Sequence, residues 1–166
     1  MPQPGSAPGL VAGPGIDQLN TALRAELGAA ETCDRARDFA SAALDGVLLA
    51  NRDCHRTRAH AISALVQTRG GEPSIGWGIW PEIAAWCGAS RRPSPEDLRA
   101  LLIAGEERHR QLCLRVLARI DAGAAAALRP RLLRAQEAVL ERLRLPAPQP
   151  EPTAAEPEIE LVRRGW

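Results

Sequence analysis

The sequence predicts an all-α protein, a bundle of four helices, on three observations. Aromatic residues make up only 3% of the 166 residues, with no Tyr and one Phe, whereas β-sandwiches and barrels need aromatic and β-branched residues. Between two proline-rich ends, a stretch dominated by Ala, Leu and Arg repeats its apolar residues at helical spacing. Gly and Pro residues punctuate this stretch, so we expect a single helical domain over residues 16–145.

The first two helices are expected at about residues 17–38 and 39–68. The second ends before Gly70 and Pro73, because Gly can form a left-handed cap and Pro cannot continue a helix. Their inward positions recur at spacings of three and four residues. These positions are Leu19, Leu23, Glu26, Ala30 and Cys33 in the first helix, and Leu44, Leu48, Asn51, His55, Arg58, Ile62 and Leu65 in the second.

The third helix has the clearest start, because Ser94 can cap it and Pro95 suits its first turn. The fourth is expected to begin near Pro130 and to end at Leu145, before Pro146. The inward positions are Leu98, Leu102, Glu106, His109, Cys113, Val116 and Ile120 in the third helix, and Leu132, Gln136, Val139 and Leu143 in the fourth.

A long connection over residues 74–93 separates the second and third helices and holds three of the four Trp residues. Within it, residues 80–87 predict a short helix with Pro81 in its first turn. Long crossovers occur in bundles where consecutive helices run in the same direction. We therefore expect a crossover whose Trp residues cover one edge of the core.

The two ends of the chain hold nine of its 14 prolines. Residues 1–15 are expected to be a disordered arm, and residues 146–157 a Pro-rich linker. Residues 158–166 are again rich in apolar and Arg residues. This composition is typical of a docking peptide, although the segment could instead fold back on the bundle. Its expected anchors are Ile159, Leu161 and Trp166.

Charge and cysteine content exclude several classes of protein. The net charge of +1 provides no overall field to attract nucleic acid or an anionic membrane. No apolar run is long enough to span a bilayer, and the first residues lack the pattern of a signal peptide. The four cysteines form no CxxC pair, so we expect free, mostly buried thiols in a cytoplasmic protein.

The inward positions of the four helices include polar residues at corresponding heights along the bundle, where a bundle core is normally apolar. Glu106 and His109 are three residues apart and so share one helical face. Buried charge must be paired or bound to a metal, and inward carboxylates and imidazoles are the ligands of metal sites in helical bundles. The candidate metal ligands are Glu26, His55, Glu106 and His109, for Fe, Mn or Zn.

Residues 19–27 resemble the first helix of ferritin-like proteins, in which the residue corresponding to Glu26 is a metal ligand. Together with the turn at residues 70–73, the Trp-containing crossover and Glu106, this resembles a bacterial ferritin-like family catalogued as a domain of unknown function. The resemblance implies a ferritin-like four-helix bundle. A complete di-iron site is not expected, because His55 and Arg58 stand where that family has Glu and His, and no His follows Gln136.

Two interpretations of the polar layer remain open. In one, Arg58 forks between Glu26 and Glu106, and the layer is a structural hydrogen-bond network left from a metal site. In the other, Arg58 points outward and the four candidate ligands bind one transition metal.

The corresponding functions differ in class. Under the first interpretation the protein is a non-enzymatic binding or interaction protein. Under the second it binds a metal and acts in metal storage or in the handling of oxidative stress. The tail is similar in layout to that of ferritin-like cargo proteins of bacterial nanocompartments, so a shell is one expected partner. Another protein bound by the tail and a second copy of the chain remain alternative partners.

Overall fold

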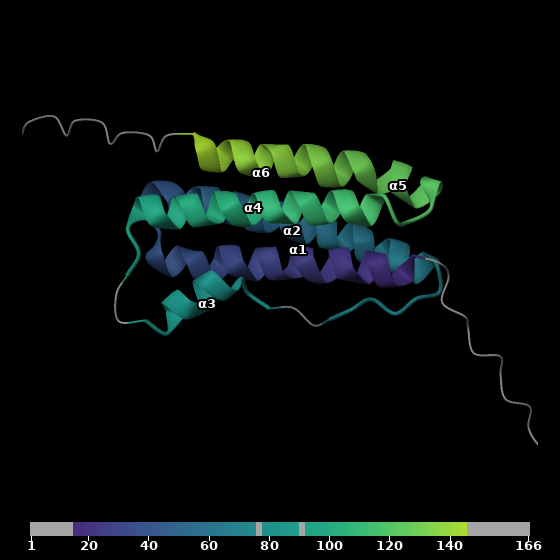
Figure 1. The fold of residues 1–166 in the computed structure, drawn as a ribbon, viewed down its shortest axis with the longest axis horizontal. Coiled ribbons are helices and arrows are strands. Elements are labelled where there is room, and N and C mark those ends of the chain that lie inside the picture. Colours follow the sequence, from purple (N-terminus) through teal and green to yellow (C-terminus); the bar gives the residue numbers. More distant parts are fainter. Residues whose placement is uncertain (1–14, 76–77, 90–91, 146–166) are drawn as a thin grey trace, which may run out of the picture.

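The computed structural model describes residues 15–75, 78–89 and 92–145, and over these residues the only regular elements are helices (Figure 1). The all-α prediction is therefore confirmed. The expected N-terminal arm other than Gly15, the Pro-rich linker and the docking peptide lie outside the described residues. The helices are α1 (Ile16–Ala36), η1 (Arg37–Phe39), α2 (Ala42–Thr68), α3 (Pro81–Cys87), α4 (Pro95–Leu117), α5 (Ala122–Arg129), η2 (Pro130–Arg134) and α6 (Ala135–Arg144).

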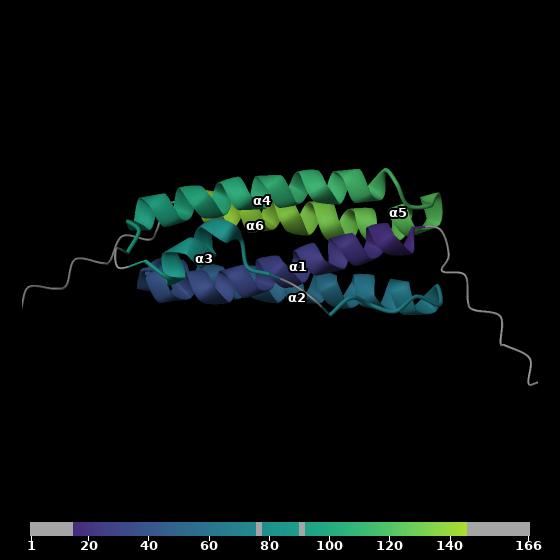
Figure 2. The same cartoon turned by 60° about the horizontal axis from the view of Figure 1, so that its bottom comes forward.

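The long helices pair as α1 with α2 and α4 with α6, and these two pairs lie against each other (Figures 1 and 2). Neighbouring helices within each pair run in opposite directions, and so do α1 and α4 (Figure 1). The connection between α2 and α4 returns along the length of the molecule and contains α3 (Figure 1). None of the described helices has the length and apolar content needed to cross a bilayer.

The core divides into two apolar clusters with a polar layer between them. One cluster joins the start of α1 to the ends of α2 and α4, and includes Leu19, Ile62 and Leu132. The other joins the opposite ends of the same helices, and includes Leu48 and Leu102. The predicted inward residues are buried, except that Leu65 is half-buried.

Local signals in the sequence explain several helix ends. The Ser94 side chain accepts a hydrogen bond from the backbone N–H of Asp97 at 3.0 Å, which caps α4 as predicted. After α2, Gly70 adopts a φ of 74°, and the backbone N–H of Gly71 donates to the carbonyl of Val66 at 3.0 Å. A residue with a Cβ would be strained at this φ, so glycine is needed there.

Two predicted helix starts are wrong. The second helix begins at Ala42, because residues 37–39 form a 3₁₀ turn and Ala40 and Ser41 are extended. The fourth helical segment begins at Ala122, where Asp121 caps it by accepting from the backbone N–H of Ala124 at 3.0 Å. Pro130 lies inside this segment and has no backbone N–H to donate. The π-helical turn from Pro130 to Arg134 accommodates this missing donor, so the helix continues.

The crossover packs tightly over the groove between α1 and α4. A Cβ on Gly28 would lie 2.6 Å from the carbonyl oxygen of Gly78, and the ring of Trp80 fills the space beside Gly105. The Thr32 hydroxyl accepts a hydrogen bond from the backbone N–H of Trp80 at 3.0 Å. Trp80 therefore covers the core as expected, whereas Trp77 lies outside the described residues.

Candidate functional site

A layer of buried polar side chains crosses the middle of the bundle. Each long helical segment contributes, because each inward stripe places a polar residue at the same depth. The members are fully or almost fully buried, with exposed fractions of 0–5%. They are Glu26 from α1, Asn51, His55 and Arg58 from α2, Glu106 and His109 from α4, and Gln136 from α6.

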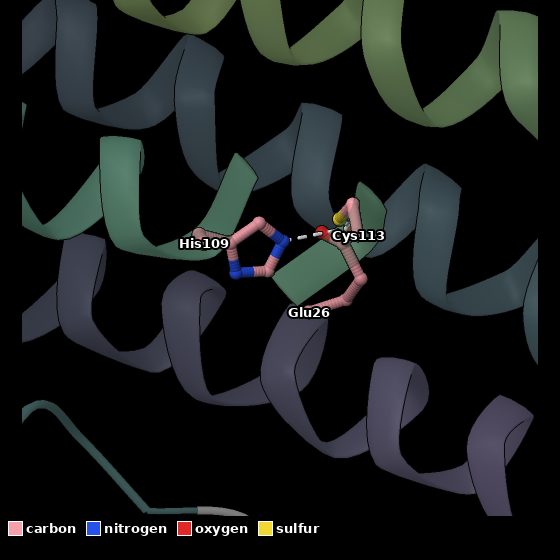
Figure 3. A group of neighbouring side chains, drawn as sticks. All are labelled: Glu26, His109 and Cys113. Atoms are coloured by element: carbon pink, nitrogen blue, oxygen red, sulfur yellow. Dashed lines mark hydrogen bonds and ion pairs between the residues drawn. The ribbon is translucent and has the colours of Figure 1, made fainter. Parts of the chain in front are cut away.

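The two carboxylate oxygens of Glu26 have different neighbours. Oε2 accepts from Arg58, whose Nε and Nη2 both lie 3.0 Å away, and His55 Nδ1 lies 2.8 Å from the same oxygen. Oε1 faces α4, where His109 Nε2 lies at 3.0 Å and Cys113 Sγ at 4.0 Å (Figure 3). Arg58 therefore occupies one side of the carboxylate and leaves the other side to His109 and Cys113.

Glu106 is held by α2 and α6. Its Oε1 lies 3.1 Å from His55 Nε2, and its Oε2 accepts from Gln136 Nε2 at 2.6 Å. The same amide nitrogen donates to the backbone carbonyl of Glu106 at 3.0 Å. His55 thus bridges the two buried glutamates, one at each ring nitrogen.

His109 contacts Glu26 without a hydrogen bond. Its Nε2 is buried and forms an ion pair with Glu26 Oε1 at 3.0 Å, although the contact does not have the geometry of a hydrogen bond. Buried polar atoms are normally hydrogen-bonded, so an imidazole nitrogen whose one polar contact is an ion pair without hydrogen-bond geometry needs an explanation. An ion bound by both atoms would also account for this arrangement.

The buried charges compensate one another. Burial works to raise the pKa of Glu26, but His109 and then Arg58 outweigh it and hold this pKa well below its usual value. Burial likewise raises the pKa of Glu106, and His55 lowers it overall. Burial lowers the pKa of His109, but Glu26 raises it to about 9. Two carboxylates therefore face two cations, since a guanidinium is always charged.

His55 lies between both glutamates and Arg58. Burial lowers the pKa of His55, whereas Glu106 and Glu26 raise it overall. Arg58 Nη2, however, lies only 2.6 Å from His55 Nδ1, and a guanidinium nitrogen can only donate. Glu26 Oε2, which can only accept, lies 2.8 Å from the same Nδ1, so Arg58 and Glu26 compete for this nitrogen. The other ring nitrogen, Nε2, faces Glu106 in either case.

Two cysteines complete two groups of ligand-type side chains in this layer. Glu26, His109 and Cys113 place one ligand atom each within 4.8 Å of one another (Figure 3), and Cys33, His55 and Glu106 do the same. The four predicted metal ligands are thus brought into one layer but divided between two groups. Cys33 and Cys113 were predicted only as inward-facing, free thiols, although each lies seven residues after one of the buried glutamates.

Other expected contacts differ from the structure. Arg58 is buried, which contradicts the outward orientation, and no ion pair among the described residues joins it to Glu106. Asn51 lies outside the network, because its Oδ1 accepts from Arg142 Nε at 2.8 Å. All four cysteines are free as expected. Cys33 and Cys113 are buried, Cys54 is half-buried and Cys87 is exposed.

Comparison with known proteins identifies no family model that matches the chain, and neither a curated protein nor a solved structure matches it.

Proposed function

We propose that the protein is a metal-binding helical bundle that holds a divalent transition-metal ion in its buried polar layer. Glu26 and His109 are the central ligands, and Glu106 and His55 form the adjoining pair. The observation that carries the proposal is the contact of His109 Nε2, which lies 3.0 Å from a carboxylate oxygen without forming a hydrogen bond to it. An ion between the two atoms would satisfy both.

Arg58 does not occupy the ligand side of Glu26. Its Nε donates to Oε2 and its Nη2 lies 3.0 Å from the same oxygen, while Oε1 faces His109. Carboxylate ligands in metal sites are commonly oriented by a hydrogen bond to their second oxygen. Arg58 therefore acts as the group that orients Glu26, and its positive charge remains paired with Glu26 when a cation binds at the other oxygen.

The arrangement of helices supports a ferritin-like bundle for this protein. Four long helical segments lie side by side, the long connection joins α2 to α4, and the buried glutamates lie on the first and third of these segments. Oxygen and nitrogen ligands suit Fe, Mn or Zn, and the class of function is metal storage or oxidative-stress handling.

A second candidate rests on charge balance. Because Arg58 and protonated His109 offset the two glutamates, the layer is also satisfied as a structural network, in a non-enzymatic binding or interaction protein. In that case a partner, such as a nanocompartment shell or another protein, would bind through the terminal segment with Ile159, Leu161 and Trp166. A second copy of the chain is a further candidate partner.

Metal analysis separates the two candidates. Full-length protein, stripped with a chelator and dialysed against Zn(II), Fe(II) or Mn(II), is expected to retain at least one equivalent of one of these ions. Glu26→Gln should lower the amount retained by one equivalent, because it removes the charge while keeping the shape of the side chain. Glu31→Gln is the matched control, since Glu31 lies on the same helix and pairs with Arg35 on the surface. Wild-type protein that retains no ion would contradict the metal-binding proposal and leave the structural network.

A further inference from the structure

The buried glutamates and cysteines of α1 and α4 form a repeated pattern. Cys33 follows Glu26 by seven residues, and Cys113 follows Glu106 by the same seven. Seven residues make almost two helical turns, so each Glu and Cys lie on the same face of their helix. All four side chains are buried in or beside the polar layer.

The antiparallel packing of α1 and α4 turns this pattern into two mixed groups (Figure 1). In that register the Glu of each helix meets the Cys of the other. Glu26 therefore lies with Cys113, and Cys33 lies with Glu106. A histidine joins each group, His109 in the first and His55 in the second.

From this geometry we infer that the bundle holds two metal ions, each bound by one thiolate, one imidazole and one carboxylate. The inference rests on the proposed function and deepens it, because it assigns the number of ions and their chemical class. One site consists of Glu26, His109 and Cys113, and the other of Cys33, His55 and Glu106. Three protein ligands leave a fourth position on each ion for water or an external ligand.

The first site already has nearly the right dimensions. A tetrahedral zinc ion requires roughly 3.3 Å between its nitrogen and oxygen ligands and roughly 3.6 Å between its sulfur and oxygen ligands. The corresponding distances are 3.0 Å from His109 Nε2 to Glu26 Oε1 and 4.0 Å from Cys113 Sγ to the same oxygen. All three ligand atoms lie within 4.8 Å of one another, so small shifts of the side chains would place them around one ion.

Binding at the first site leaves the net charge of the layer unchanged. A divalent ion displaces one proton from His109 and one from the Cys113 thiol, because only the neutral imidazole and the thiolate coordinate metals. Two positive charges leave as two arrive. Arg58 and Glu106 therefore remain balanced as they are in the metal-free layer.

Thiolate ligands determine the class of ion. Sulfur favours Zn(II) and similar borderline ions over Mn(II), which prefers oxygen ligands. The first site also lies close to the surface, because His109 lines a surface hollow together with Gly28, Trp80 and Gly105. Zn(II) is accordingly the expected occupant, and Co(II) is its spectroscopic substitute.

The test is a Co(II) titration of reduced, chelator-stripped, full-length protein followed by absorption spectroscopy. We expect two equivalents to bind, with sulfur-to-cobalt charge-transfer bands that reach a plateau only at the second equivalent. Zn(II) should bleach the bands, whereas Mn(II) should not. This measurement requires no variant, so it does not depend on how substitutions in the core affect folding.

Cysteine variants assign the ions to the two sites. Cys113→Ser and Cys33→Ser should each lose one equivalent and about half of the charge-transfer absorbance, and the double variant should lose all of it. Cys54→Ser and Cys87→Ser are the controls, because neither residue belongs to these groups.

Other results would overturn the inference. One Co(II) ion bound without charge-transfer bands, or bands that survive the double variant, would refute thiolate ligation while leaving the proposed function intact. Protein that binds no Co(II), Zn(II), Fe(II) or Mn(II) would refute both.

Discussion

The raised pKa of His109 predicts that the metal-free protein loses stability as the pH rises above neutrality. Glu26 raises this pKa from 6.5 to about 9 against the opposing effect of burial. A group whose pKa is higher in the folded state stabilises that state fully below its unfolded pKa. The stabilisation by His109 is therefore complete below about pH 6.5 and is lost as the pH rises through about 9.

The size of the effect follows from the shift in pKa. Each pKa unit corresponds to 1.36 kcal/mol, so a rise from 6.5 to about 9 corresponds to about 3 kcal/mol. The free energy of unfolding should fall by about this amount across the interval, with a slope approaching about 1.4 kcal/mol per pH unit. Such a loss is a large fraction of the stability of an ordinary domain.

Urea denaturation followed by circular dichroism, with chelator and reductant present, measures this free energy from about pH 6 to about pH 9. His55 also has a raised pKa and contributes in the same direction, as does Cys33 at the alkaline end of the range. The decisive quantity is therefore the difference between the wild type and His109→Gln, which should have a flatter profile. His60→Gln should keep the wild-type slope, because His60 is exposed. Equal slopes in the wild type and His109→Gln, or stability that rises with pH, would refute the reasoning.

Two further predictions concern packing and buried charge. Gly105→Ala should destabilise the protein by about 1–3 kcal/mol, because its Cβ would occupy the space of the Trp80 ring. Gly46→Ala should stabilise it by about 0.5–1 kcal/mol, because a Cβ there would have nothing within 4 Å and Ala favours a helix over Gly. Thermal unfolding of the two variants should shift in opposite directions, and a shared direction would contradict the close packing of the crossover. In metal-free protein, Arg58→Met should cost about 3–5 kcal/mol, because it leaves Glu26 buried without its guanidinium partner. Arg56→Met on the same helix should change stability by less than about 1 kcal/mol, because its ion pair is exposed. If the two variants lose the same free energy of unfolding in urea denaturation, the Arg58 pair contributes no more than a surface ion pair.

The inward stripes were predictable from sequence because helical periodicity is a local property. Leu19, Leu48 and Leu102 are buried as their spacing predicts, and so are the polar residues of the layer. The cap at Ser94 was predictable for the same reason, since a side chain and a backbone N–H three residues apart meet within one turn. The start of the last helical segment was not, because a π-helical turn accommodates Pro130 inside a helix that local rules would begin there.

The sequence by itself determined which residues enter the core and at what depth, because periodicity assigns each residue to a face of its helix. Only the tertiary structure decided which of them meet. The antiparallel register of α1 and α4 brings Glu26 to Cys113 and Cys33 to Glu106, and no spacing within one helix specifies a register between two helices. The partner of Arg58 was decided in the same way, because its guanidinium reaches Glu26 Oε2 and leaves Oε1 to His109.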